Sequence, residues 1–376
     1  MRAGLLAALT MSAVLAACQT GQGPLSPQPS ASPGPSGPTL SPNPVALTEP
    51  ALGIAGGLLH ACVTLRDGGV ACWGNNDWGQ LGDGGKTDRP VPVVVAGLPD
   101  ATAVAAGYRF SCAVHAGGAV ACWGWNGVGQ LGDGTMKDSW VPALVVGLTD
   151  AVSIAGGDGH TCAIRAGGIV ACWGWNDDGQ LGDGTTTTRS VPGDVSGLTD
   201  ALAIATGGAH TCAIRTGGTL VCWGKNDFGQ LGDGTKTDSP VPVAVAGMTD
   251  VVAVAAGDAH TCAVRAGGAV MCWGKNEFGQ LGDGTTVTSP RPVAVSGLAG
   301  ATTIAAGYRY SCALRGEGAA VCWGNNDWGQ LGDGSTLSTP LPVAVSWIPS
   351  VTVITAGYRH SCALDAAGAV VCWGRD

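Results

Sequence analysis

Short apolar runs alternate with turn residues at a constant spacing of fifty residues from Ala51 to the end of the chain. Glycine-rich turns separate the runs, and no segment of the repeat region shows a helical period. The copy that starts at Val251 has four such runs, at 251–256, 260–265, 269–274 and 292–295. The pattern predicts four antiparallel strands in each copy.

Seven copies follow one another without an insertion or deletion. A fixed period of this length indicates one supersecondary unit stacked on copies of itself, so we expect one large domain from the 376-residue chain. Pro292 places the fourth strand at a sheet edge, where a missing N–H donor is tolerated. The sequence therefore predicts an all-β fold, a seven-bladed β-propeller of four-stranded antiparallel blades.

Each copy carries two cysteines, one before and one after a three-residue turn whose last residue is always glycine, as at Gly268. Glycine is expected there because this position of the hairpin requires a left-handed backbone. The resulting register places Cys262 opposite Cys272 at a non-hydrogen-bonded site, where the two backbones come closest. We therefore expect seven disulfides. The pairs are Cys62–Cys72, Cys112–Cys122, Cys162–Cys172, Cys212–Cys222, Cys262–Cys272, Cys312–Cys322 and Cys362–Cys372.

The last copy stops after its third strand, and the strand that it lacks has a counterpart at the other end of the chain. The segment Pro44–Leu47 precedes the first copy and aligns with fourth-strand segments such as Pro242–Val245. We expect this N-terminal strand to complete the last blade and close the ring, which removes the two open faces of a linear array.

Residues 1–18 have the pattern of an export signal rather than of the fold. Arg2 precedes a short apolar stretch, and Leu15–Cys18 resembles the lipobox of bacterial lipoproteins. The resemblance implies cleavage before Cys18, lipidation of its thiol and anchoring to a membrane. An ordinary secretory signal with an incidental cysteine is the alternative. Gln19 after the cysteine favours the outer membrane or cell surface over the inner membrane.

Composition defines the remaining parts of the chain. Residues 19–41 are rich in proline and serine and predict a disordered tether, followed by the propeller at 42–376. Fourteen of the fifteen cysteines form the repeated pairs, and an exported protein meets an oxidising compartment. A zinc site is not expected at these cysteines, because zinc normally takes four ligands and a hairpin offers two. Free thiols are therefore the alternative to disulfides. The net charge of −9 argues against a nucleic-acid partner.

Three motifs carry a resemblance to a known family: His-x-Cys-Ala, Gly-x-Val-x-Cys-Trp-Gly and Asn-x-x-Gly-Gln-Leu-Gly-Asp-Gly. They resemble the repeat of the regulator of chromosome condensation family over about 330 residues. The resemblance implies a seven-bladed propeller closed by the chain ends. The family's eukaryotic founder is a nucleotide exchange factor for the small GTPase Ran, so exchange is one function that the resemblance implies.

Residues that recur in the copies are interpreted as scaffold. A strand-start role is expected for the histidines at 60, 160, 210, 260 and 360, and packing between blades for the tryptophans of Cys-Trp-Gly. The aspartates of the long loops have too few neighbouring oxygen ligands for calcium. We expect no catalytic residues, no enzyme activity, no metal and no cofactor.

Residues that break the repeat gather in the loops after the first and third strands, which lie on one face of a propeller. Tyr-Arg pairs occur in three copies that are close together only in a closed ring. Tyrosine, tryptophan and arginine supply much of the binding energy at protein interfaces. The predicted partner-binding residues are Trp78, Tyr108, Arg109, Phe110, Tyr308, Arg309, Tyr310, Trp328, Tyr358 and Arg359.

This face has two interpretations, since the Tyr-Arg pairs could instead stack locally on the long loop of the neighbouring blade. With recognition as the role, we expect a monomeric, membrane-anchored scaffold in the bacterial cell envelope that binds a protein partner of unknown identity. A carbohydrate or cell-wall binding module is the first alternative, because aromatic side chains also stack on sugars. A guanine-nucleotide exchange factor is the second, by family analogy only.

Overall fold

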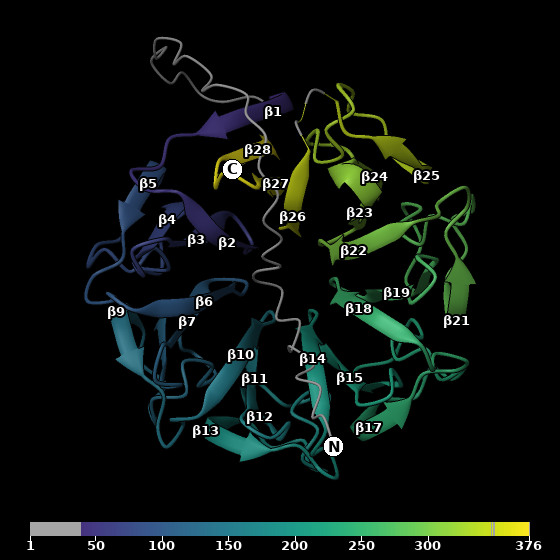
Figure 1. The fold of residues 1–376 in the computed structure, drawn as a ribbon. Coiled ribbons are helices and arrows are strands. Elements are labelled where there is room, and N and C mark those ends of the chain that lie inside the picture. Colours follow the sequence, from purple (N-terminus) through teal and green to yellow (C-terminus); the bar gives the residue numbers. More distant parts are fainter. Residues whose placement is uncertain (1–38, 347, 349, 376) are drawn as a thin grey trace, which may run out of the picture.

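The structure is a computed structural model that describes residues 39–346, 348 and 350–375. Seven four-stranded antiparallel sheets surround a central axis (Figure 1). The predicted all-β, seven-bladed propeller is therefore confirmed. In the described part of the chain the only helix is a three-residue 3₁₀ turn, η1 (Gly316–Gly318), which is far too short to cross a bilayer. The predicted signal, Cys18 and most of the predicted tether lie outside the described residues.

In each blade the first strand lies nearest the axis and the later strands lie progressively outward (Figure 1). Blades are numbered 1 to 7 from the one that begins with β2. The innermost strands are β2 (Ala51–Gly56), β6 (Ala101–Ala106), β10 (Ala151–Gly156), β14 (Ala201–Thr206), β18 (Val251–Ala256), β22 (Ala301–Ala306) and β26 (Val351–Ala356). The second strands are β3 (His60–Leu65), β7 (Phe110–His115), β11 (His160–Arg165), β15 (His210–Arg215), β19 (His260–Arg265), β23 (Tyr310–Arg315) and β27 (His360–Asp365).

Two further strands complete each blade on its outer side. The third strands are β4 (Val70–Gly74), β8 (Val120–Gly124), β12 (Val170–Gly174), β16 (Leu220–Gly224), β20 (Val270–Gly274), β24 (Ala320–Gly324) and β28 (Val370–Gly374). The outermost strands are β5 (Arg89–Val94), β9 (Ser139–Leu144), β13 (Arg189–Asp194), β17 (Ser239–Ala244), β21 (Ser289–Ala294), β25 (Thr339–Ala344) and, for blade 7, β1 (Thr39–Val45).

The hairpin between the second and third strands has the predicted register. The amide of Arg265 donates to the carbonyl of Ala269, and Gly268 has a φ of +76°. Cys262 lies opposite Cys272, and all seven predicted disulfides are present with Cα atoms 4.0–4.1 Å apart. Seven disulfides in one chain point to an oxidising, extracytoplasmic environment.

The ring is closed by β1, which pairs antiparallel with β28 as predicted. The register differs from the sequence alignment by two residues, because Pro44 lies opposite Val371 and so corresponds to Ala244, which lies opposite Val221. The fifty-residue numbering therefore extends unbroken into the N-terminal strand. A shift of two preserves the face of every side chain. Val45 accordingly packs against the core between blades 7 and 1.

The hydrophobic core lies between neighbouring blades. Cys262 and Val264 of blade 5 pack with Ile304 and Trp323 of blade 6. The same arrangement occurs at the closing interface, where blade 7 contributes Leu364 and Val370 and blade 1 contributes Ile54 and Trp73. Because this interface buries the equivalent side chains, the two ends of the array are joined by the same packing that joins its middle.

Buried polar side chains also connect the blades. Trp173 Nε1 donates to the carbonyl of Gln130 in the preceding blade at 2.9 Å, and five equivalent tryptophans repeat this bond. His160 Nε2 bonds to Thr211 Oγ1 in the following blade at 2.9 Å. Burial lowers the pKa of His160 to about 3, so the ring is neutral near pH 7. These contacts confirm the packing role expected for the tryptophans, and they give the histidines a structural one.

Candidate functional site

The loops that follow the first and third strands lie together on one face, as predicted, and we call it the loop face. The amide of Trp125, at the start of a long loop, donates to the carbonyl of Arg109 in the shorter one, and Asn325 donates likewise to Arg309. The hairpin turns at Gly68 and its equivalents lie on the opposite face, which we call the hairpin face, bonded to the turn before the next blade. The two faces therefore present different loops.

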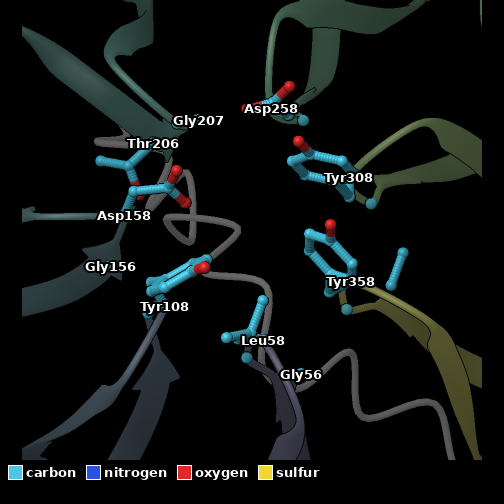
Figure 2. Close-up of a pocket in the computed structure, with 18 of the residues that line it drawn as sticks. Gly56, Leu58, Tyr108, Gly156, Asp158, Thr206, Gly207, Asp258, Tyr308 and Tyr358 are labelled. Carbon is cyan, nitrogen blue, oxygen red and sulfur yellow. The ribbon is translucent and has the colours of Figure 1, made fainter. Parts of the chain in front are cut away.

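The short loops meet around a cavity of about 100 Å³ at the mouth of the central channel (Figure 2). Its walls divide into two arcs. Tyr308, Tyr358, Leu58 and Tyr108 form one arc, and Asp158 and Asp258 form the other, as Figure 2 shows. The mouth is therefore aromatic on one side and acidic on the other.

Glycines position these side chains by allowing the backbones of neighbouring blades to approach closely. A Cβ atom at Gly57 would lie 2.3 Å from the His60 ring and 2.6 Å from the carbonyl oxygen of Gly107. Such distances exclude any side chain at this position. A glycine stands at the equivalent position in every blade, and the residue that follows it is held at the rim of the channel.

The two aspartates face each other across a residue without a side chain. A Cβ atom at Gly208 would lie 2.9 Å from Asp258 Oδ1 and 3.3 Å from Asp158 Oδ2. Burial and the charge of Asp258 raise the pKa of Asp158 to about 7. Burial also raises the pKa of Asp258, although the nearby charges of Lys275 and Arg309 favour its ionised form. Near neutral pH the pair therefore carries less than its full negative charge.

The predicted tyrosines and arginines of blades 6 and 7 form one continuous series of contacts. The Tyr308 and Tyr358 rings are stacked with centroids 4.0 Å apart, and Figure 2 shows them side by side. The Arg309 guanidinium carbon lies 4.7 Å from the Tyr308 centroid, and that of Arg359 lies 5.1 Å from the Tyr358 centroid. The outer contacts are Arg309 with Phe278 at 4.9 Å, Arg359 with Trp328 at 4.6 Å and Arg375 with Trp328 at 4.5 Å.

We call this series the arginine ladder: Phe278, Arg309, Tyr308, Tyr358, Arg359, Trp328 and Arg375. A similar but separate group occurs in blades 1 and 2, where the Arg109 guanidinium contacts Tyr108 at 5.1 Å and Trp78 at 5.2 Å. The stacking on the neighbouring long loop, left open by the sequence, is therefore present. It joins adjacent blades and leaves all four arginines partly exposed.

Internal bonds of the long loops hold the rings of this face in place. Asn76 Oδ1 accepts from the amide of Leu81 at 3.0 Å, and Asn76 Nδ2 donates to Asp83 Oδ1 at 3.1 Å. Gln80 Oε1 accepts from the amide of Trp78 at 2.9 Å. The repeated asparagine, glutamine and aspartate side chains thus fix the loop conformation, and Trp78 extends from a rigid support.

Two residues predicted to contact a partner cannot do so. Phe110 and Tyr310 are buried, with 1% and 0% of their surface exposed. They occupy the strand-start position that is histidine in the other blades, and Tyr310 donates its hydroxyl hydrogen to the carbonyl of His360 in blade 7. Aligning them with His60 would have revealed this structural role. The other eight predicted residues are partly exposed on the loop face.

Sequence reasoning also missed several residues of the face. Asp158 and Asp258 occupy the same repeat position as Tyr108, and Phe278 occupies that of Trp78. Arg375 was missed because it follows the last cysteine pair and has no equivalent loop after it in this sequence. The repeat alignment contained the signal for the first three, since each stands at a position that varies between copies and was already assigned to the face.

Three arginines of the hairpin face have a different environment. Arg165, Arg215 and Arg265 form ion pairs with Asp150, Asp200 and Asp250 at 2.9, 2.8 and 2.7 Å. On the loop face, no carboxylate among the described residues forms an ion pair with Arg109, Arg309 or Arg359. In the described part of the chain the three loop-face guanidinium groups thus contact aromatic rings but form no ion pair.

Fold and loop face together define a closed repeat propeller with a common scaffold and variable loops on one face. A family model described as the RCC1-like domain matches residues 146–376. The model of the regulator of chromosome condensation (RCC1) repeat matches residues 67–114 and 117–164, and a second model of this repeat matches residues 101–130. The chain belongs to the regulator of chromosome condensation (RCC1) family.

Solved structures with the same fold include human WBSCR16, which is 23% identical with a TM-score of 0.79 over 92% of this chain and 94% of the other. Prp20p from Saccharomyces cerevisiae, characterised for its binding to Gsp1p and histones, is 23% identical with a TM-score of 0.73 over 87% and 82%. The ectodomain of the Physcomitrella patens receptor kinase CR4 is 21% identical with a TM-score of 0.54 over 86% and 73%. These identities establish the fold alone. No curated protein sequence matches the chain.

Proposed function

We propose that the protein is a membrane-anchored, extracytoplasmic scaffold that binds a protein partner through its loop face. The arginine ladder is the observation that carries this proposal. It combines partly exposed tyrosine, tryptophan and arginine side chains, the residue types that dominate the energetics of protein interfaces. Its members are held by a disulfide-bonded frame, so little conformational entropy is lost when a partner binds.

Two further observations support a location outside the cytoplasm. Seven disulfides require oxidising conditions, and the segment before Cys18 has the composition of an export signal. Lipid on Cys18 would attach the protein to a membrane, and the proline-rich segment after it would hold the propeller away from the surface. One of the solved relatives, Prp20p, has binding properties to Gsp1p and histones, so a propeller of this fold can serve as a binding protein.

A protein partner is favoured over a glycan by what already covers the rings. Stacking on a sugar requires an open aromatic face, whereas the Trp328 ring contacts two guanidinium groups, those of Arg359 and Arg375. The Trp78 ring contacts Arg109 and Lys86. These pairs of a ring and a cation offer a protein partner charged groups and amphipathic edges rather than an open ring face. Nucleotide exchange rests on family analogy, and no feature of the loop face favours it.

The experiment is partner capture by the full-length protein in envelope extracts, with chemical cross-linking and mass spectrometry. The double variant Arg309→Ala with Tyr358→Ala should lower capture by about 100-fold or more, since each residue is expected to be a hot spot. Thermal unfolding should change little, because both side chains are partly exposed. The matched control is Arg265→Ala on the hairpin face, which should capture the same partner as the unmodified protein. Equal capture by the double variant would remove the proposal.

The anchor is tested separately. Replacing Cys18→Ser should shift the protein from the membrane fraction to the soluble fraction and abolish incorporation of labelled palmitate. Retention in the membrane fraction with unchanged labelling would contradict lipidation at Cys18 and leave the protein-binding proposal standing.

A further inference from the structure

The arginines of the arginine ladder have an environment that differs from that of the ion-paired arginines on the hairpin face, and the difference points to a binding site. On the hairpin face, Arg215 Nε donates to Asp200 Oδ1 at 2.8 Å, so its charge is compensated within the blade. Arg309 and Arg359 of the arginine ladder have no ion pair with any described carboxylate. Among the described residues Arg66, Arg291 and Arg315 also lack an ion pair, but they are exposed to solvent. Arg309 and Arg359 differ because they are partly buried between aromatic rings, where water solvates the charge less completely, and a ligand would compensate it.

The hydrogen-bond donors of these two arginines are largely unused. Nε of Arg309 and Nε of Arg359 are buried without a hydrogen-bond partner. Within residues 39–346, 348 and 350–375, the only polar contact of either guanidinium is the 3.4 Å bond from Arg309 Nη2 to the Tyr308 hydroxyl. An aromatic ring attracts a guanidinium through its positive charge, and this cation–π contact does not replace a hydrogen bond to the N–H groups. The Nη groups consequently remain available to an acceptor from outside.

The arrangement of charge favours an anion that approaches from outside the channel mouth. Arg309 and Arg359 lie in adjacent blades and are linked through the stacked Tyr308 and Tyr358 rings. Asp258 at the channel mouth interacts electrostatically with Arg309, but the two form no ion pair. The planar fork of Nη donors matches the two oxygens of a carboxylate.

We propose that Arg309 and Arg359 form a carboxylate-binding site that takes the acidic side chains of the protein partner. This assignment rests on the proposed function, since it names the chemistry of the segment that the loop face recognises. Aspartate or glutamate residues of the partner would each accept hydrogen bonds from one guanidinium. The rings beside each arginine contact the aliphatic part of the acidic side chain and exclude water, which strengthens the ion pair.

The test uses glutarate, a small dicarboxylate, with the full-length protein labelled with ¹⁵N at arginine. In NMR spectra at constant ionic strength, the side-chain N–H signals of Arg309 and Arg359 should shift and saturate on addition of glutarate. The signals of Arg165, Arg215 and Arg265 should not shift, since aspartates already occupy them. The variant with Arg309→Lys and Arg359→Lys keeps both charges but loses the fork, and should bind glutarate about tenfold more weakly. Its thermal unfolding confirms that it is folded.

The outcomes separate this inference from the proposed function. Shifts no larger than those produced by sodium chloride would overturn the carboxylate site, even if the Arg309→Ala, Tyr358→Ala variant still loses its partner. Saturable glutarate binding that does not compete with partner capture would contradict the role assigned to the site in partner binding. Competition of capture by polygalacturonate, but not by an acidic peptide of equal charge, would assign the site to acidic glycans and overturn the protein partner.

Discussion

Arg215 and Arg309 lie on opposite faces of the same disc, and their guanidinium groups have different neighbours. Arg215 ends a second strand and forms an ion pair with Asp200, which stands in the turn before its blade. Arg309 stands in the loop before a second strand, contacts Phe278 and Tyr308, and forms no ion pair with a carboxylate of any residue that the structure describes. The two arginines lie in different copies of one repeated unit. Because the backbone of the unit is the same in both copies, the difference follows from the side chains that surround each arginine.

The comparison teaches how a repeat protein separates stability from recognition. The hairpin face compensates its charges locally within each of three central blades. On the loop face, the repeated Asn, Gln and Asp side chains form hydrogen bonds that fix the loop conformation. The variable Tyr, Arg and Trp side chains are left partly exposed. Variants of equivalent chemistry on the two faces should therefore have different consequences.

The largest effect is expected from reversing a charge on each face. Arg359→Glu places a carboxylate in the arginine ladder and should lower partner capture by more than about 100-fold, with little change in thermal unfolding. Arg215→Glu faces Asp200 on the hairpin face and should leave capture unchanged. Capture is measured by cross-linking in envelope extracts. Similar losses in both variants would show that the two faces do not differ as described.

A frame residue should affect stability without affecting recognition. His160→Ala removes a buried ring and its hydrogen bond to Thr211 Oγ1, which keeps only its bond to the Gln180 carbonyl, and should cost about 2 kcal/mol of unfolding free energy. Denaturant unfolding measures this cost, and capture at 25 °C should be retained. The natural replacement of this histidine by Phe110 in blade 2 makes His160→Phe the control, with a smaller cost. Loss of capture in a folded His160→Ala protein would mean that recognition extends into the frame.

The acidic arc of the channel mouth predicts a dependence of stability on pH. The pKa of Asp158 is raised from 3.8 to about 7, so the folded protein binds this proton more tightly than the unfolded chain. The stabilisation is complete below about pH 4 and is lost as pH rises through 7, at about 1.4 kcal/mol for each unit of pKa difference. Asp158→Asn should remove this part of the slope, whereas Asp67→Asn on the exposed hairpin face should keep it.

The unmodified protein must serve as the reference at every pH, because the buried histidines have the opposite dependence. The pKa of His60 and of His210 is lowered to about 3 by burial, so their contribution is present above pH 6.5 and is lost as pH falls. Chemical unfolding of the variant and the unmodified protein between pH 4 and 8 gives the difference. An identical slope in Asp158→Asn would contradict the raised pKa.

The smallest effect is expected on the hairpin face. Arg265→Ala removes an ion pair with Asp250 in which both side chains are more than one third exposed, so the unfolding free energy should fall by about 0.2–1 kcal/mol. Thermal unfolding at low and high salt measures it, and salt should reduce the difference. An effect above about 2 kcal/mol would show that this face contributes more to the frame than a surface ion pair does.

The frame could be predicted from the sequence because every blade repeats the same local constraints. Glycine at the position of Gly268 determines the hairpin register, and the register places each cysteine opposite its partner. Ring closure by the N-terminal strand was also predictable. Its register was not, because Pro42 and Pro44 both resemble the proline of an outer strand and only pairing with β28 distinguishes them.

The site was predictable in its location but only partly in its composition. Departures from the repeat identified Tyr308, Arg309 and their equivalents, since scaffold residues recur and face residues vary. Phe110 and Tyr310 also depart from the repeat, yet they replace a buried histidine, and residue type alone does not report burial. The contact between Arg375 and Trp328 joins the end of blade 7 to a loop of blade 6, and linear spacing does not contain it.

Site-specific photo-cross-linking in cells that express the protein tests the central claim most directly, because it reports which face meets the partner. A photoreactive p-benzoylphenylalanine is introduced at Asp327, exposed beside Trp328 on the loop face, and separately at Ala266, exposed in a turn of the hairpin face. We expect a discrete cross-linked protein from position 327 and none from position 266. Cross-links from position 266, with none from position 327, would contradict recognition through the loop face.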